Sequence, residues 1–109
     1  MALDCYPSPA PDPEAGEVVT EELVVEEDVL VKLFALGPGA AVDEHVHDDA
    51  TNVFHVLAGT VTVVQDGEAA AVSAPGVVHN ARGVAHGMRN DTDEVAVLTA
   101  SLCPLPGSG

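Results

Sequence analysis

Hydrophobic and polar residues alternate with a period of two along most of the chain, which is the pattern of half-buried β-strands. Residues 28–36 differ in that apolar side chains occupy both faces, as in a strand buried on both sides, and a single lysine interrupts one of them. One face carries Val29, Val31, Leu33 and Ala35, and the other carries Leu30, Lys32, Phe34 and Leu36. The following Gly37-Pro38-Gly39 sequence predicts the end of this strand.

Similar short runs follow along the chain, separated by turn signals. Residues 52–64 predict one long strand or two strands interrupted near Gly59, and Asp66-Gly67 predicts a hairpin turn into a strand over 68–73. Further strands are expected over 77–80, 84–89 and 94–102. No window combines helical periodicity with capping residues, so the pattern predicts an all-β sandwich or barrel.

The composition supports this fold class and limits the chain to one domain. With 109 residues, of which 47% are hydrophobic, the chain can build a single core. Nineteen valines and no isoleucine favour strands, because β-branched side chains fit a pleated surface. We expect a proline-rich extended arm over residues 1–16, a barrel domain over 17–103 and a flexible tail over 104–109.

The charge of the chain excludes two classes of partner. Eighteen acidic residues against Lys32, Arg82 and Arg89 give a formal net charge of −15. Nucleic acids and anionic lipids are bound through lysine and arginine, so we expect neither nucleic acid nor a membrane as a partner. The first sixteen residues lack the basic and apolar regions of a signal peptide, which predicts a cytoplasmic protein. In that reducing compartment Cys5 and Cys103 are expected to be free thiols.

The candidate chemistry lies in the histidines, all of which fall in the middle of the chain. They are His45, His47, His55, His79 and His86. On a strand, His45 and His47 would share one face with backbone positions about 6.5–7 Å apart, and two imidazoles at that spacing can bind one metal ion. A histidine pair alone is a weak signal, so a metal site needs further ligands.

A first group of regularly spaced residues surrounds this pair. Gly39 is followed after five residues by His45, Val46 and His47, after four more by Asn52, and after a further six by Gly59. This spacing resembles the first motif of the cupin superfamily, in which a glutamate stands at the position of Asn52.

A second group resembles the second cupin motif. It begins at Gly76 and continues with Gly83, two residues, His86, three residues and Asn90. Two departures are present: Ala81 stands where the family has proline, and the stretch after Gly76 is one residue short.

The resemblance implies a small double-stranded β-helix barrel of antiparallel strands that holds one divalent transition metal ion. The family binds the ion through two histidines and a glutamate of the first motif and a histidine of the second, which here are His45, His47, Asn52 and His86. An amide oxygen is a weaker ligand than a carboxylate, so Asn52 is either a weak ligand or a structural residue. Three imidazoles suit Fe, Zn, Ni, Mn or Cu.

Four further residues have candidate roles. His79 precedes a short turn before His86 and is a possible fourth ligand, a proton-transfer group or a packing residue. Alternation turns His55 away from Asn52 and Phe54, toward the surface or a subunit contact. Phe54 is expected to line the barrel interior as a substrate-binding residue. Arg82 is expected to pair with a substrate carboxylate or with one of the many acids.

The expected function is that of a metal-binding cupin that acts on or binds a small organic molecule. The favoured form is a three-histidine, metal-dependent dioxygenase, because three neutral imidazoles leave open coordination positions for both substrate and oxygen. The alternatives are a non-catalytic ligand-binding or sensing barrel, and a metal-dependent isomerase or lyase. We also expect a homodimer that pairs through outer-strand surfaces, including residues 17–30, because an open sheet leaves strand edges to cover.

The charge also predicts a strong response to salt, as in proteins of salt-loving organisms; the alternative is an ordinary acidic bacterial protein. We expect the melting temperature to rise steeply between low and molar sodium chloride, because salt screens repulsion between carboxylates. One source of this repulsion is the acidic cluster Glu21, Glu22, Glu26, Glu27 and Asp28. Scanning calorimetry measures the change, and a melting temperature that barely moves would contradict this prediction.

Overall fold

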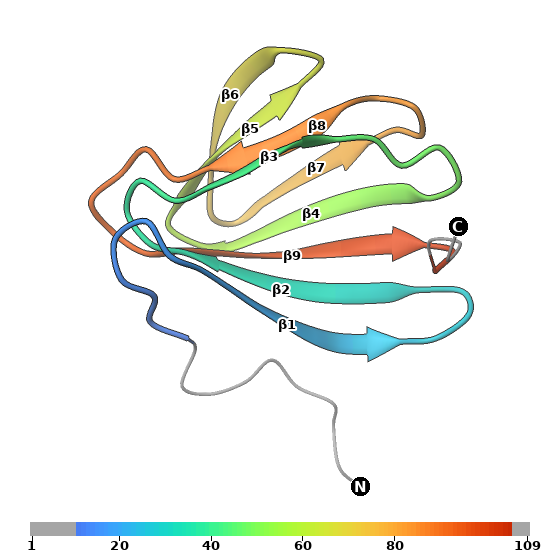
Figure 1. Ribbon diagram of the computed structural model, residues 1–109, viewed down its shortest axis with the longest axis horizontal. Coiled ribbons are helices and arrows are strands. Elements are labelled where there is room, and N and C mark those ends of the chain that lie inside the picture. Colours follow the sequence, from blue (N-terminus) through green and yellow to red (C-terminus); the bar gives the residue numbers. More distant parts are fainter. Residues whose placement is uncertain (1–10, 106–109) are drawn as a thin grey trace, which may run out of the picture.

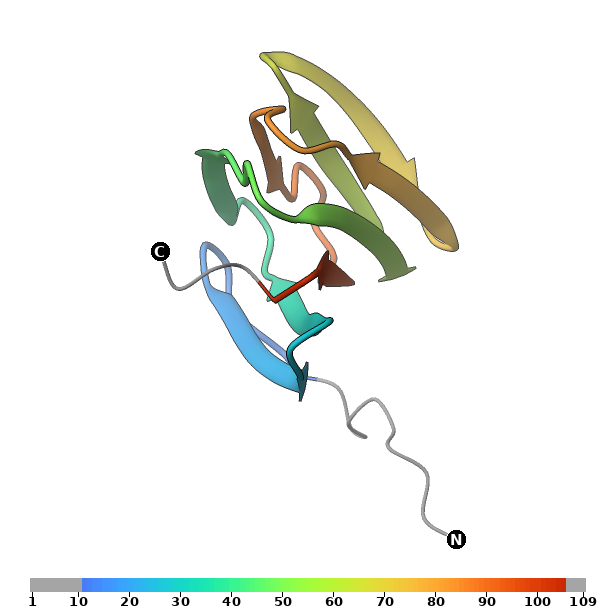
Figure 2. The same ribbon diagram turned by 90° about the vertical axis from the view of Figure 1, so that its right-hand side faces the viewer.

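The computed structural model describes residues 11–105, which form nine β-strands in two sheets and no helix (Figure 1). The strands are β1 (Val18–Val25), β2 (Leu30–Leu36), β3 (Ala41–His45), β4 (Thr51–Ala58), β5 (Thr60–Gln65), β6 (Glu68–Ser73), β7 (Gly76–Asn80), β8 (His86–Arg89) and β9 (Ala96–Cys103). One sheet has the order β1-β2-β9-β4-β7 and the other β3-β8-β5-β6. Figure 2 shows the two layers, with β1 and β6 at opposite ends.

From β2 onward the chain is one long hairpin wound into two sheets. β2 pairs with β9, β3 with β8, β4 with β7 and β5 with β6, and every pair is antiparallel. This nested pairing is a double-stranded β-helix, so the predicted fold class is confirmed. β1 adds an edge strand beside β2. As a consequence, segments far apart in the sequence lie side by side, among them the end of β3 and the start of β8.

The predicted strands are present, with shifted boundaries. The run 52–64 forms two strands, and Gly59 between them has a φ of 73°, which glycine adopts without strain. Asp66 and Gly67 both have positive φ, as a tight hairpin turn requires. The sequence pattern delimited neither β1 nor β3. The expectation that His45 and His47 share a strand is wrong, because β3 ends at His45.

The core lies between the two sheets and uses one face of β2. Phe34 and Leu36 pack there against residues of both sheets, among them Phe54 and Met88. The opposite face of β2 carries Leu33 and Ala35, which pack against β1 and β9 on the outside of the larger sheet. Because side chains alternate along a strand, Lys32 shares the inner face with Phe34.

The expected arm and tail fall largely outside the described residues, as does Cys5. Within the described part, the backbone N–H of Gly16 donates to the Pro38 carbonyl at 2.8 Å, and that of Leu105 donates to the Glu27 carbonyl at 3.1 Å. The domain boundaries and the homodimer stay predictions. Cys103 is an exposed free thiol. Across residues 11–105 there is no helix long and apolar enough to cross a membrane.

Asn90, the last residue of the second motif, ties the loop before β9 to the end of β2. Its side chain is fully buried, and its amide nitrogen donates to the carbonyls of Leu36 at 2.9 Å and Glu94 at 2.7 Å. Its amide oxygen accepts from the backbone N–H of Thr92 at 2.9 Å and from the Thr92 hydroxyl at 2.7 Å. The side chain therefore uses both donors and its acceptor in holding the loop.

Replacing this amide tests its contribution to the fold. We expect Asn90→Ala to lower the free energy of unfolding by about 2–4 kcal/mol, because several hydrogen bonds are lost and the Leu36 carbonyl stays buried without a partner. Urea denaturation measures the change, with Asp93→Ala, an exposed position in the same loop, as the control. A loss for Asn90→Ala no larger than for the control would show that the amide is dispensable.

Candidate metal centre

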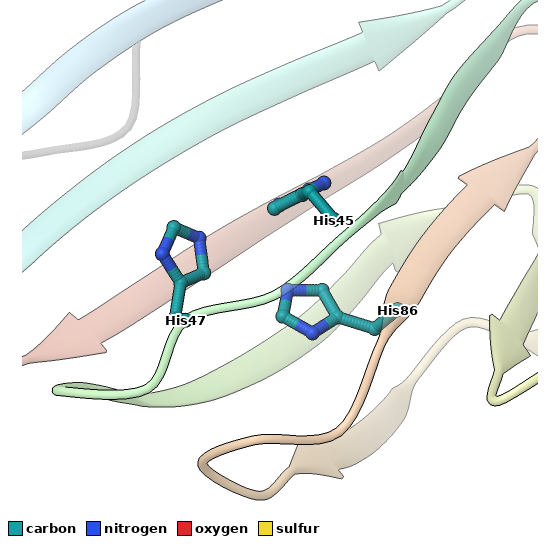
Figure 3. Close-up of side chains that lie close together, drawn as sticks. All are labelled: His45, His47 and His86. Carbon is teal, nitrogen blue, oxygen red and sulfur yellow. The ribbon is translucent and has the colours of Figure 1, made fainter.

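Three of the five histidines meet where β3 ends and β8 begins (Figure 3). His45 and His86 are direct partners in the β3–β8 register, and His47 follows two residues after β3. One ring nitrogen from each lies within 4.8 Å of the other two. The ring centroids are 4.6 Å apart for His45 and His86, 5.0 Å for His45 and His47, and 5.5 Å for His47 and His86. Nested pairing thus brings both motifs to one point.

A glycine in β8 allows β3 to come this close. The register of the β3–β8 pair shifts between Val42 and His45, and the irregular segment of β3 lies against Gly87. A Cβ at Gly87 would meet the Val42 carbonyl oxygen at 2.8 Å and the Glu44 nitrogen at 2.9 Å, both backbone atoms that cannot rotate away. Any larger residue here would push β3, and His45 with it, away from His86.

Two of the three rings are oriented by backbone carbonyls. Nδ1–H of His45 donates to the Asp43 carbonyl at 3.1 Å, and Nδ1–H of His86 donates to the Val84 carbonyl at 3.1 Å. A carbonyl only accepts, so the ring proton lies on Nδ1 and Nε2 keeps its lone pair. Metal-binding histidines characteristically donate their second nitrogen in this way.

Burial keeps two of the imidazoles neutral. It lowers the pKa of His47 below its usual 6.5, and the neighbouring His45 lowers it further, against a smaller opposing effect of Asp49. Burial also lowers the pKa of His86; the Val84 carbonyl opposes this, while His45 and His47 reinforce it. At neutral pH both rings are therefore in the form that binds metal ions.

Asn52, at the position of the family glutamate, lies beside the third ring. It is buried on β4, and its amide nitrogen donates to Nε2 of His86 at 2.9 Å. Its amide oxygen is buried without a hydrogen-bond partner among the described residues. Half a turn of the amide exchanges the two atoms and directs the oxygen toward Nε2. The site thus contains an acceptor that a bound ion or water would satisfy.

His45, His47 and Asn52 line a cavity of about 320 Å³ between the sheets. Phe54 forms part of its wall, with its ring centroid 5.9 Å from that of His86. Among the described residues, the lining is mostly apolar and includes no aspartate or glutamate. It consists of Leu30, Lys32, Phe34, Val42, His45, His47, Asn52, Phe54, Met88, Ala100 and Leu102. A larger hollow of about 590 Å³ between β5, β6 and β7 is lined by no histidine.

The structure places two expected site residues outside this cavity. His79 is exposed on β7, and its backbone carbonyl accepts from the Gln65 side chain at 2.9 Å. Arg82 is also exposed and donates to the Thr51 hydroxyl and to the Cys103 carbonyl, each at 3.4 Å. Neither residue joins the three histidines. His55 is exposed on β4, as the alternation predicts.

Sequence reasoning missed two residues of this region. Lys32 lines the cavity, and its position on an otherwise apolar face of β2 was the signal that could have identified it. Asn80 is the cross-strand partner of Asn52 and is fully buried, with its amide oxygen accepting from Gln65 at 2.7 Å and its amide nitrogen without a partner among the described residues. No local pattern marks Asn80, because its role depends on the pairing of β4 with β7.

Comparisons with known proteins match the fold. A family model described as a cupin domain matches residues 32–102. The TT1209 protein from Thermus thermophilus is 30% identical, with a TM-score of 0.76 over 81% of this chain and 84% of that one.

Two further solved structures are 22% identical to this chain and show the fold alone. The match to a double-stranded β-helix protein from Klebsiella pneumoniae has a TM-score of 0.80 and covers 89% of this chain and 84% of that one. A predicted oxalate decarboxylase from Thermotoga maritima has a TM-score of 0.77 and covers 83% of each chain. No curated protein matches the chain.

The lowered pKa values predict how stability depends on pH in the metal-free protein. In the unfolded chain His47 and His86 return to a pKa of 6.5 and take up protons before the folded state does. The stabilising contribution of these two rings to the free energy of unfolding is therefore fully present above pH 6.5. It is lost as the pH falls through the lowered pKa values of the folded state. Urea denaturation between about pH 7.5 and 5.5 should show this fall.

Matched variants assign the fall to these rings. The double variant His47→Gln/His86→Gln should flatten the pH dependence, and His55→Gln, on the exposed face of β4, should leave it unchanged. An unchanged slope in the double variant would contradict the assignment.

Proposed function

The chain belongs to the family of cupin domains, and from this premise we propose that it binds one divalent transition metal ion through His45, His47 and His86 and acts there on a small organic molecule. The observation that carries the proposal is the convergence of three ring nitrogens, two of them from histidines that line a mostly apolar cavity. The two motifs contribute to it from strands that are paired only in the folded chain.

The donor set fits such an ion. Backbone carbonyls hold the His45 and His86 rings with Nε2 unprotonated, and burial favours the neutral form of His47. Three imidazoles suit Fe, Zn, Ni, Mn or Cu, and three protein ligands leave coordination positions open. Asn52 either donates to His86 as a structural residue or turns its amide oxygen toward the ion as a weak fourth ligand.

The favoured reaction is that of a dioxygenase. When bound, a redox-active metal supplies Lewis acidity and positions for both oxygen and substrate. The protein's own residues exclude water with the apolar walls around Phe54 and hold the substrate against the histidines. An isomerase or lyase would need a proton-transfer group; the described lining includes no carboxylate, so Lys32 or a histidine would have to take this role. Three neutral imidazoles leave coordination positions for both oxygen and substrate, which favours the dioxygenase.

A non-catalytic barrel that binds or senses a small ligand is the second candidate. The same absence of carboxylates from the lining supports it, because an apolar cavity with few polar groups is suited to binding alone. Oxygen consumption in the presence of iron and a panel of small organic acids distinguishes the two candidates. Turnover supports the enzyme, whereas saturable binding without turnover supports the binding protein.

Metal content tests the ligand set. We expect alanine at His45, His47 or His86 to remove most of the bound metal, because two remaining imidazoles do not form the chelate of three fixed ligands. His55→Ala is the matched control and should retain metal, because this histidine is exposed on the far face of β4. Plasma emission spectrometry of the purified variants gives the stoichiometry. Full retention in His86→Ala would break the proposed link between the two motifs.

Asn52 gives a test in the opposite direction. Asn52→Glu restores an anionic ligand beside Nε2 of His86, so we expect tighter metal binding in competition with a chelator. Asn52→Asp is the control, because it adds the same negative charge on a shorter side chain. If the wild type takes up no metal under any loading condition, the enzyme proposal fails and the metal-free binding barrel replaces it.

A further inference from the structure

Lys32 differs from the other two basic residues because its side chain lines the histidine cavity. It is half-buried on the inner face of β2, and its ammonium nitrogen lies 5.4 Å from the ring centroid of Phe34, another lining residue. Arg82 and Arg89 are exposed outside the cavity, and Arg89 pairs with Asp91 at 2.9 Å. The single cation of the cavity is therefore a lysine held against an aromatic wall.

This ammonium has no carboxylate partner among residues 11–105. Among these residues Arg89 forms an ion pair with Asp91, and Lys32 forms none. Glu22 lies opposite Lys32 in the β1–β2 pair, but its side chain is exposed and is not part of the cavity lining. In a chain with eighteen acidic residues, it is notable that this lysine has no acidic partner among residues 11–105, because a charge beside apolar walls is costly until an opposite charge joins it.

We infer that the cavity recognises a small organic carboxylate and that Lys32 is the residue that pairs with its anionic head. This inference rests on the proposed function, because it names the class of substrate that the same site would take. The apolar body of the ligand packs against Phe34 and Phe54, which leaves its polar end beside the lysine and the histidines. Asn52, where the family has glutamate, leaves the cavity without a competing anion.

The lining favours a carboxylate over a phosphate. Phosphate groups are usually held by several donors at once, such as arginine forks or the backbone N–H groups of a helix N-terminus. Here the described lining residues include one ammonium, no arginine and no hydroxyl side chain. One point charge in an apolar cavity of about 320 Å³ matches a single acidic group on a short apolar body.

Benzoate and benzamide are suitable probes, because they share shape and size and differ in charge. Isothermal titration of the wild type, metal-free and zinc-loaded, should show benzoate binding about tenfold or more tightly than benzamide, as expected for a charge-assisted hydrogen bond. Lys32→Met should abolish this preference, and Lys32→Arg should restore part of it. Arg89→Met changes the net charge of the chain equally but lies outside the cavity, so it should keep the preference.

Metal content and melting temperature measured on the same samples separate this inference from the proposed function. Lys32→Met should fold and bind zinc like the wild type. Loss of the benzoate preference in metal-free Lys32→Met supports the role of Lys32 even if no metal binds. Equal binding of the two probes to the wild type, no binding of either, or a preference that survives in Lys32→Met would overturn the inference while leaving the metal site untouched.

Discussion

The antiparallel pairing of β3 with β8 is the constraint on which the candidate site depends. It places His45 opposite His86, and the bulged end of β3 brings His47 to the same point. The close approach needs Gly87, because any side chain at this position would collide with the backbone of β3. This pair is one layer of the nested hairpin, so the surrounding strands hold the three rings in place without a dedicated loop.

The charge of the cavity lining contrasts with the net charge of the chain. The chain carries a net charge of −15, yet the lining that residues 11–105 give the histidine cavity contains one lysine and no acid. Burial and mutual repulsion hold His47 and His86 neutral, and backbone carbonyls fix the rings of His45 and His86. Neutral donors and a lone ammonium together produce a site suited to a cation and to an anionic ligand, inside a protein whose exterior repels anions.

Much of this arrangement could be predicted from local sequence patterns. Runs of β-favouring residues located β2 and the strands from β4 onward, and the Asp66-Gly67 pair located the β5–β6 hairpin, because both signals act over a few residues. The spacing of the two motifs selected the same three histidines that the structure brings together. The resemblance to the cupin superfamily was needed for this step, because spacing alone does not show which strands pair.

The rest depends on contacts between distant strands. The end of β3 at His45 follows from its bulge against Gly87, and the burial of Asn80 follows from the pairing of β4 with β7. Arg82 was expected to pair with a substrate carboxylate or with an acidic residue, and in the folded chain it donates to the Thr51 hydroxyl and the Cys103 carbonyl. X-ray absorption spectroscopy of the zinc-loaded protein tests most directly whether the histidines share one ion. Three imidazole nitrogens at about 2.0–2.1 Å are predicted, and a shell with one imidazole or none would contradict the three-histidine site.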